Sequence, residues 1–243
     1  MEYREFDRAV NTQYGDSRSW APTSSFPALM QKVYTWMTMA MLITGVTAYG
    51  VASSPAILST IFGNQIVFWG MIIAEFALVF MISGMLNRLS LTTATLMFVA
   101  YSVINGAVLS SIFLVYTMES IGMVFFITAA TFGIMAFIGY TTKTDLTSIG
   151  KYMMMALIGI IIATVVNIFV KSSGLQMIVS YIGVLLFVGL TAYDSQKIKN
   201  MLIDQDVADE GAQKLALIGA LTLYLDFINL FIYLLRILGS RRD

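Results

Sequence analysis

Four ionisable residues lie in or beside strongly apolar stretches of this 243-residue sequence. Glu75 and Asp226 each fall in the middle of such a stretch, Asp194 ends another, and Arg88 follows one closely. An ionisable group inside a hydrophobic span costs ~3 kcal/mol on insertion scales and is therefore a candidate functional residue. Two close carboxylates cannot both ionise cheaply, so such a pair would share a proton and respond to pH. Carboxylate oxygens also suit the hard ion Ca²⁺, which makes Asp194 and Asp226 candidate calcium ligands.

A second interpretation applies to the residues near span ends. Arg88 and Asp194 could be interfacial residues whose side chains reach water. Asp226 could not do so, because eleven residues of its stretch precede it and twelve follow it. It needs a partner or a water-filled cavity. A buried cluster in which Arg88 neutralises one carboxylate would satisfy this requirement, and we expect Glu75 to face the bundle interior for the same reason.

Several other kinds of chemistry are excluded by composition. The chain has no cysteine and no histidine, so disulfides, thiolate nucleophiles, Cys/His zinc sites and imidazole catalysis are all excluded. Any proton-linked behaviour must use carboxylates. The formal net charge is zero, and there is no long basic run, so nucleic acid is a poor candidate partner. We expect neither an enzyme nor a bound cofactor.

The elements that must position these groups are membrane spans. Hydrophobic residues make up 58% of the chain and charged residues only 12%, whereas soluble domains carry about 25% charged residues. Seven apolar stretches each approach the ~20 residues that a helix needs to cross a bilayer. We therefore predict an all-α integral membrane protein with about seven transmembrane helices, at approximately 33–52, 66–86, 91–116, 121–140, 152–170, 177–193 and 215–238.

These spans divide the chain into a polar tail (1–31), a transmembrane domain (32–239) and a C-terminal tail (240–243). The connections are mostly short, but the segment from Ser195 to Lys214 is long and acidic. It lacks the spacing of an EF-hand, so a solvated linker is favoured over a calcium loop. Ala129 and Gly133 are expected to let neighbouring helices approach. The asparagines within spans are expected to form interhelical hydrogen bonds; they are Asn105, Asn167 and Asn229.

The distribution of Lys and Arg predicts the orientation. With the N-terminus in the cytoplasm, ten of these residues lie inside and four outside, which the positive-inside rule favours. The expected location is the cell membrane, with several spans and a cytoplasmic N-terminus. Three of the four outside charges follow or end the last span, so a last segment that re-enters the membrane remains an alternative.

Two stretches of the sequence carry a family resemblance. The last span and the end of the sixth resemble the motifs of the Bax inhibitor family, also called the transmembrane Bax inhibitor motif family. The residues concerned are Leu223-Tyr224-Leu225-Asp226-Phe227-Ile228-Asn229-Leu230-Phe231 with Leu234-Leu235-Arg236, and Ala192-Tyr193-Asp194 with Gln196 and Ile198. Asp145-Leu146 and Asn167-Ile168-Phe169 add to the resemblance, which covers 32–239.

The resemblance implies a fold and a function. The family fold is a bundle in which six helices surround a short seventh. Members are proposed to be pH-sensitive calcium leaks in which two aspartates share a proton and an arginine acts as a latch. Carried over, the pair is Asp194 and Asp226, the latch is Arg88, and Glu75 resembles the acidic residue of the second helix. Arg88 is then expected to pair with one aspartate in the closed state and to release it at low pH.

Two other functions remain open. A stress-response regulator that binds other membrane proteins would use apolar helix faces that sequence cannot distinguish from lipid contacts. An intramembrane aspartyl protease would also place one aspartate in each of two spans. Such proteases resemble one another in a Gly-x-Gly-Asp motif, however, and Tyr224-Leu225 precede Asp226 here. Lipid, calcium as the transported ion and membrane proteins are therefore the expected partners.

Overall fold

The computed structural model describes residues 26–242, and nearly all of this part of the chain is helical. The elements in chain order are α2 (Phe26–Ala52), α3 (Pro55–Gly63), α4 (Gln65–Gly84), the 3₁₀ turn η2 (Leu86–Arg88), α5 (Leu91–Leu109), α6 (Ile112–Val115), α7 (Met118–Thr141), α8 (Thr147–Val170), α9 (Ser173–Leu202) and α10 (Glu210–Leu238). Among the described residues there is no strand beyond one isolated bridge, between Tyr116 and Arg241.

Seven helical segments are long and apolar enough to cross a membrane. Six are single helices, and the third span, Leu91–Val115, combines α5 and α6. The shortest, α4, has 20 residues and is therefore ~30 Å long, the thickness of a hydrocarbon core. The prediction of an all-α membrane protein with seven spans is confirmed.

The helix boundaries differ from the predicted ones where polar residues continue a helix beyond the apolar stretch. The first described helix, α2, already includes Phe26 and the residues up to 31, which were predicted as part of the tail. Helix α9 ends at Leu202, so Asp194 lies within the helix and the loop before α10 is only 203–209, shorter than the predicted linker. Residues 55–63, predicted as a connection, form α3 with Pro55 in its first turn, where proline is favoured. Residues 1–25 of the predicted tail and Asp243 lie outside the described residues.

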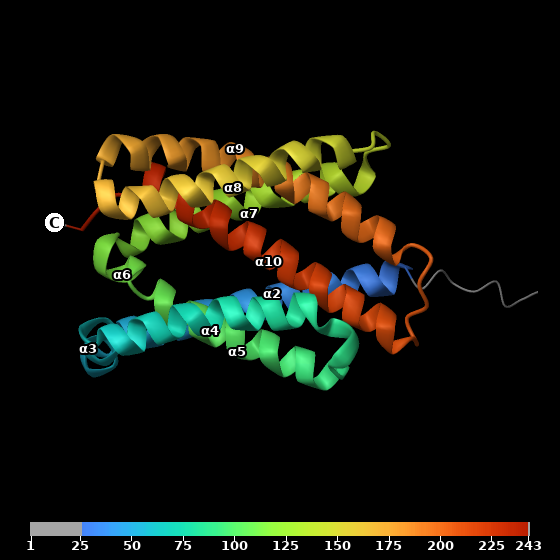
Figure 1. The fold of residues 1–243 in the computed structure, drawn as a ribbon, viewed down its shortest axis with the longest axis horizontal. Coiled ribbons are helices and arrows are strands. Elements are labelled where there is room, and N and C mark those ends of the chain that lie inside the picture. Colours follow the sequence, from blue (N-terminus) through green and yellow to red (C-terminus); the bar gives the residue numbers. More distant parts are fainter. Residues whose placement is uncertain (1–25, 243) are drawn as a thin grey trace, which may run out of the picture.

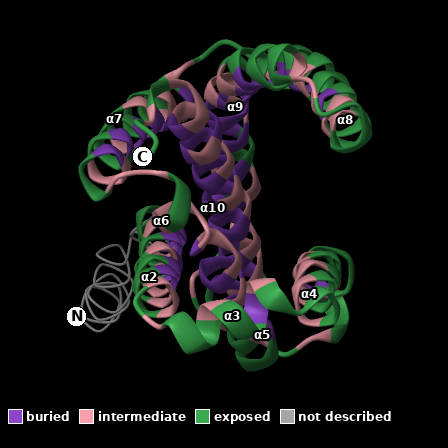
Figure 2. Cartoon of the chain, turned by 90° about the vertical axis from the view of Figure 1, so that its left-hand side faces the viewer, coloured by how far each residue is buried: buried purple, intermediate pink, exposed green. Residues whose placement is uncertain are grey.

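Helix α10 occupies the centre of the bundle (Figure 1) and packs against α2, α5, α7 and α9. Helices α4 and α8 pack mainly against α5 and α9, respectively, and lie at the periphery (Figure 2). In the most apolar window 67% of α10 is buried, against 6% for α4 and for α8. The expected central position of the last helix is thus confirmed, but with 29 residues it is not the short helix that the resemblance implied. The six surrounding helices form an inner group of four and an outer pair.

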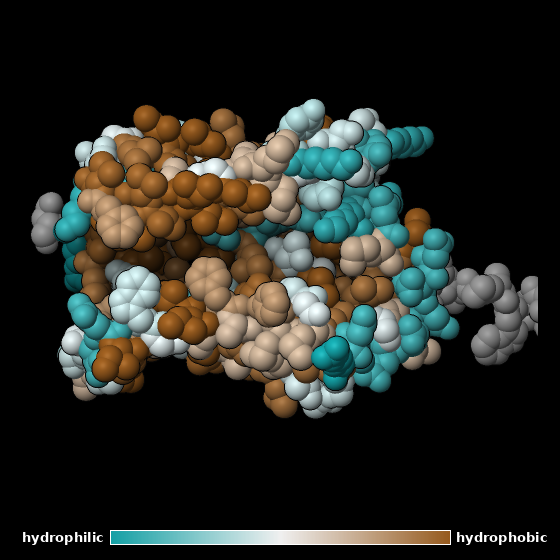
Figure 3. Space-filling view, viewed as in Figure 1, coloured by the Kyte–Doolittle hydropathy of each residue, from teal (hydrophilic) through white to brown (hydrophobic). Residues whose placement is uncertain are grey.

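Polar caps start several of the helices. The side chains of Asn64, Ser90, Thr117, Ser172 and Asp209 accept hydrogen bonds from backbone N–H groups in the first turns of α4, α5, α7, α9 and α10. These bonds satisfy donors that a helix start otherwise leaves free. Polar residues gather at both ends of the bundle, with apolar residues covering much of the face between them (Figure 3).

The last span is one continuous helix. Its 29 residues extend ~43 Å, so it crosses the whole bundle rather than turning back. The chain after it is held at the start of α7, where Thr117 N–H donates to the carbonyl oxygen of Ser240 at 3.1 Å and Arg242 N–H to that of Val115 at 2.9 Å. The first described helix begins at one end of the bundle and the C-terminus lies at the other (Figure 1).

Glycines allow close approach at some interfaces but not at the one that was predicted. A Cβ at Gly139 of α7 would collide with the backbone carbonyl oxygen of Ala192 in α9. At Gly133 a Cβ would meet nothing within 4 Å. The close contact between α7 and α9 therefore depends on Gly139, whereas Gly133 lines an open cleft described below.

We expect Gly139→Ala to destabilise the bundle by about 1–3 kcal/mol, because two helix backbones must separate to accommodate the methyl group. Thermal unfolding in detergent, followed by tryptophan fluorescence, measures this change. The matched control, Gly133→Ala, places the same methyl group in open space on the same helix and should be neutral or slightly stabilising. Equal unfolding temperatures for the two variants would contradict the assigned contact.

Candidate functional site

The site is built on the antiparallel pair α9 and α10. Gly183 of α9 faces the ring of Tyr233, and Gly219 of α10 faces the side chain of Ile198, so small residues fix the register near both ends. In that register Asp194 lies about level with Leu223, only about three residues, or ~4.5 Å along the axis, from Asp226. Two carboxyl side chains can bridge such an offset.

Asp194 and Asp226 do meet in the interior. Their carboxyl groups lie within hydrogen-bonding distance of each other. The residues are 8% and 5% exposed, respectively, so both are buried inside the bundle. Oδ2 of Asp226 is fully buried and has no hydrogen-bond partner, and the same is true of the neighbouring Ser195 Oγ. Two carboxyl groups so close together in a buried site cannot both carry a charge cheaply, so the arrangement favours a shared proton.

No arginine or lysine forms an ion pair with either aspartate in the described part of the chain, where the salt bridge present joins Lys214 to Glu210 at 2.9 Å. Lys197, one turn after Asp194 on α9, is near enough to attract it electrostatically. Its ammonium group is exposed and lies 5.9 Å from the centre of the Tyr193 ring. The sequence interpretation did not assign a role to Lys197.

Arg88 does not make the expected contact. It lies on η2 and is exposed, and it forms no salt bridge with Asp194 or Asp226 in this structure. The reason is the place of its helix: η2 packs on the end of α4, and α4 packs against α5 and α3 rather than against the α9–α10 pair. An ion pair between Arg88 and the aspartates would therefore require a different arrangement of α4.

Glu75 belongs to a second polar cluster. As expected, it faces the protein, where it lies within hydrogen-bonding distance of Asn105 on α5, and its Oε1 is buried without a hydrogen-bond partner. Asn105 Nδ2 donates to the Tyr101 hydroxyl at 3.3 Å, and its Oδ1 accepts from the Tyr224 hydroxyl at 3.3 Å. The Tyr224 hydroxyl also lies 2.7 Å from Thr44 Oγ1 of α2. This cluster joins four helices but does not include the aspartate pair.

The three asparagines therefore have different roles. Asn105 forms the predicted interhelical hydrogen bond, to Tyr224 of α10. For the other two the prediction is wrong. Asn167 Oδ1 accepts from Ser172 N–H at 3.0 Å in the turn after α8, and Asn229 Nδ2 donates to the Leu225 carbonyl within α10 at 2.8 Å. Hydrogen bonds to nearby backbone compete effectively with those across an interface.

A clamp fixes the α7–α8 loop above the aspartate pair. Gln196, two residues after Asp194, donates to the Thr144 carbonyl and accepts from Leu146 N–H, both at 2.8 Å. Lys199 donates to the Tyr140 carbonyl at 2.8 Å. The side-chain amide of Gln196 thus satisfies one backbone donor and one backbone acceptor of the loop. The sequence motif that contains Asp194 therefore also has a structural role, which is to hold this loop.

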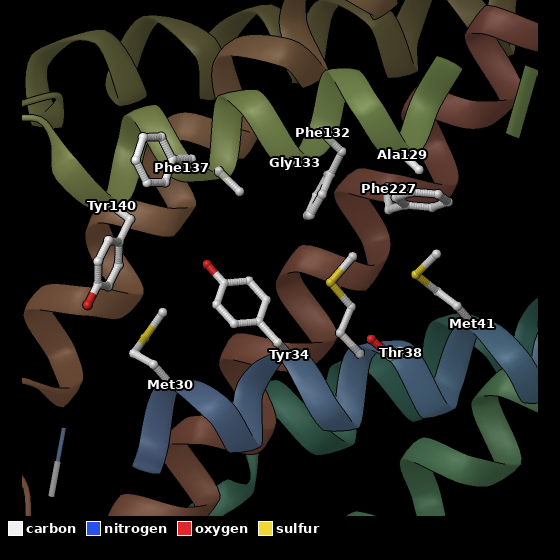
Figure 4. A pocket seen from close by; sticks show the side chains of 12 residues that line it. Met30, Tyr34, Thr38, Met41, Ala129, Phe132, Gly133, Phe137, Tyr140 and Phe227 are labelled. Atoms are coloured by element: carbon white, nitrogen blue, oxygen red, sulfur yellow. The ribbon is translucent and has the colours of Figure 1, made fainter. Parts of the chain in front are cut away.

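A cleft of about 540 Å³ lies beside the site, between α2 and α7. Figure 4 shows Tyr34, Thr38 and two methionines of α2 facing Phe132 and Phe137 of α7 across it. Phe227, which directly follows Asp226, forms part of its inner wall and packs edge to face on Phe132 with ring centres 5.5 Å apart. The cleft is largely apolar, and neither Asp194 nor Asp226 lines it.

The acids of the described residues do not build a resident metal centre. No three acidic side chains are grouped within metal-binding reach anywhere in residues 26–242. Ca²⁺ in a dedicated site takes six to eight oxygens. Asp194 and Asp226 could supply only part of that shell, and the rest would have to come from water or backbone.

Known proteins resemble this chain over nearly its whole length. The profile of the family described as "Inhibitor of apoptosis-promoting Bax1" matches residues 27–243. The inner membrane protein YbhL of Escherichia coli is 49% identical over 222 residues, which cover 91% of this chain and 95% of that protein. An uncharacterized protein of Borreliella burgdorferi is 49% identical over 216 residues, covering 88% and 92%. The chain is a multi-pass membrane protein and belongs to the Bax inhibitor family.

Proposed function

We propose that this protein is a pH-sensitive calcium leak, in which the Asp194–Asp226 pair lies on the ion pathway and senses protons. One observation carries the proposal: two carboxyl groups contact each other inside the bundle, and no basic side chain of the described residues pairs with them. Buried acids without a basic partner are costly in a membrane protein. A functional requirement explains why the cost is tolerated.

The composition of the site suits passage of calcium rather than storage. Two carboxyl groups offer hard oxygen ligands, which Ca²⁺ prefers. They are too few for a full coordination shell, and no third acid of residues 26–242 is grouped with them. Conduction requires a site that binds an ion strongly enough to admit it and weakly enough to release it. A pair of carboxylates meets that requirement, and no bound cofactor is needed.

Protons would act on this pair directly. At high pH the pair carries at least one negative charge, and at low pH both carboxyl groups are neutral. Asp145, in the α7–α8 loop, is a poorer candidate for the sensor. Hydrogen bonds from Thr147 hold the pKa of its exposed carboxyl group below the usual range, so it stays ionised near neutral pH.

The sign of the pH response separates two mechanisms. If protons simply compete with calcium for the carboxylate oxygens, flux falls as the pH falls. If an arginine holds the pair closed, protonation removes the attraction and flux rises as the pH falls. The second mechanism needs Arg88 to reach the pair in another conformation, since it is exposed and without a salt bridge here.

We propose the cell membrane as the location, with the N-terminus in the cytoplasm. The inner-membrane location of the relative YbhL supports the membrane, and the ten-to-four distribution of Lys and Arg supports the orientation. In this orientation the clamped α7–α8 loop and Lys197 face the cytoplasm, on the side to which Asp194 is nearer.

A regulator that binds other membrane proteins without transport is the second candidate. The outer position of α4 and α8 favours it, because each packs mainly on one neighbour and presents large exposed apolar residues such as Phe76 and Phe169. The family description names inhibition of another protein. Absence of calcium flux from purified, folded protein, together with a membrane protein that co-purifies through α4 or α8, would favour this candidate.

Asp226→Asn should abolish the pH dependence of calcium flux. Asparagine keeps the shape of the side chain but cannot take up or lose a proton. Flux of purified protein in liposomes, compared at pH 6 and pH 8, measures the effect. Asp204→Asn, in the exposed α9–α10 loop, removes the same charge outside the site and should behave as the wild type. A wild-type pH response in Asp226→Asn would rule out the shared proton.

The same proteins separate a leak from a protease. Because we propose that the chain is not an enzyme, a model transmembrane substrate incubated with the wild type should remain intact while calcium flux is retained. Cleavage that is lost in both Asp194→Asn and Asp226→Asn would instead assign the pair to intramembrane proteolysis.

The latch hypothesis makes its own prediction for Arg88→Ala. If an Arg88 ion pair closes the pathway, the variant should raise the resting calcium leak at pH 7 and flatten its pH dependence. Its thermal stability should change little, by about 0.5 kcal/mol or less, because the side chain is exposed here. A variant that leaks no more than the wild type at pH 7 would leave Arg88 as an interfacial residue.

A further inference from the structure

A second, polar cavity lies at the end of the bundle that carries the C-terminus. It has a volume of about 410 Å³ and is an open cavity lined by α8, α9, α10 and the turn between α8 and α9. Its lining combines polar and basic residues with two apolar ones: Thr164, Asn167, Lys171, Ser172, Ser173, Gln176 and Arg236, together with Ile168 and Val179. The aspartate pair lies elsewhere, so this cavity is not part of the site described above.

The cavity contains two positive charges and no negative one. Lys171 and Arg236 both line it, no described acidic residue does, and neither forms a salt bridge with the described residues. Two cations facing one cavity repel each other, although water screens the exposed Lys171 more than the half-buried Arg236. An anion placed between them would remove that repulsion.

The guanidinium group of Arg236 is held in place rather than free to turn away. It lies 5.6 Å from the centre of the Tyr233 ring. That ring in turn packs over Gly183 of α9 and stacks on Phe187, with ring centres 5.8 Å apart. The α9–α10 interface therefore supports the arginine, whose planar fork of N–H groups suits a phosphate.

The loop that carries Lys171 is also fixed. Lys171 has a left-handed backbone conformation with φ of 53°, the one positive φ among the described residues other than glycine. Its N–H donates to the Asn167 carbonyl, and the Asn167 side chain holds the next N–H, that of Ser172. With this conformation at Lys171, only two residues separate the end of α8 at Val170 from the start of α9 at Ser173. The first turn of α9 also borders the cavity, and its helix dipole adds positive potential.

We propose that this cavity binds a phosphate group, as carried by an anionic membrane lipid. The proposal does not depend on calcium transport. The cavity lies at an end of the bundle, at the depth of lipid headgroups, and in the orientation proposed above this end faces away from the cytoplasm. A lipid phosphate there would attract the two basic residues by charge. Beside it, the last turn of α8 exposes Ile168, Phe169 and Val170, which are 58%, 80% and 60% exposed and can contact acyl chains. A soluble phosphate would use the same contacts without this apolar surface.

Native mass spectrometry of the purified protein tests the proposal, with phosphatidylglycerol and phosphatidylcholine added in matched amounts. We expect tighter binding of phosphatidylglycerol. Arg236→Gln and Lys171→Asn should each weaken it by about tenfold or more, as loss of one charge-assisted contact implies. Asparagine tolerates the left-handed conformation at position 171, so the second variant removes the charge and keeps the turn. Lys151→Asn, an exposed lysine at the opposite end of the bundle, is the control and should bind normally.

Titration with inorganic phosphate separates the two sources of the group. Competition with phosphatidylglycerol at millimolar phosphate, lost in Arg236→Gln, supports the site and shows that the phosphate group itself is recognised. Binding of inorganic phosphate alone would reassign the site to a soluble anion. Equal binding of both lipids, or equal affinities in the two variants and the Lys151 control, would overturn the proposal.

Discussion

A carboxyl group in the middle of a membrane span must be enclosed by protein, and the bundle is organised around that constraint. Asp226 lies on α10, which is the most buried of the seven spans. Four helices pack against it, so neither Asp226 nor Tyr224 contacts lipid. An exposed acid at this depth would add several kcal/mol to the free energy of insertion. The central position of α10 therefore follows from its sequence, which places a carboxyl group in the middle of a span.

Enclosure by four helices gives α10 two distinct polar faces. Residues two apart on a helix point in nearly opposite directions, so Tyr224 and Asp226 face different neighbours. Asp226 meets Asp194 of α9, whereas Tyr224 meets Asn105 of α5 and Thr44 of α2. Glu75 joins the Tyr224 side through Asn105. The acids within spans thus form two clusters with α10 between them, and changes at one need not alter the other directly.

The sequence was most informative where one physical requirement dominates. Span number follows from hydropathy, because a lipid-exposed backbone has to be helical. Burial of Asp226 follows from the lengths of apolar chain on either side, and its pairing with Asp194 came from the family motif. Helix ends were less predictable, since α9 continues through Lys197 and Lys199. These side chains pack on tyrosine rings, and Lys199 also donates a hydrogen bond to the last turn of α7. Asn167 and Asn229 also form local hydrogen bonds to the backbone instead of the interhelical hydrogen bonds predicted for them.

Which small residue makes a close contact depends on rotation about the helix axis, and hydropathy alone does not determine that rotation. Gly133 and Gly139 both lie on α7, yet only the second meets a neighbouring backbone, while the first lines the cleft. The same reasoning applies to Arg88. Its place in the sequence sets it near the level of Asp194, but the lateral position of α4, outside α5, keeps the two apart.

That lateral position also bears on how the bundle could move. Helices α4 and α8 bury little of their surface, whereas α10 and the helices around it share most of the core. Segments with few buried contacts open at a lower free-energy cost than the core does. Of the two outer helices, α4 carries Glu75, which lies near Asn105 of the Tyr224 cluster, and continues into the turn with Arg88. A displacement of α4 would therefore disturb one half-buried acid while moving a cation, with the α9–α10 pair left intact. The helix that the family resemblance assigns to the latch is thus one that this fold leaves weakly held.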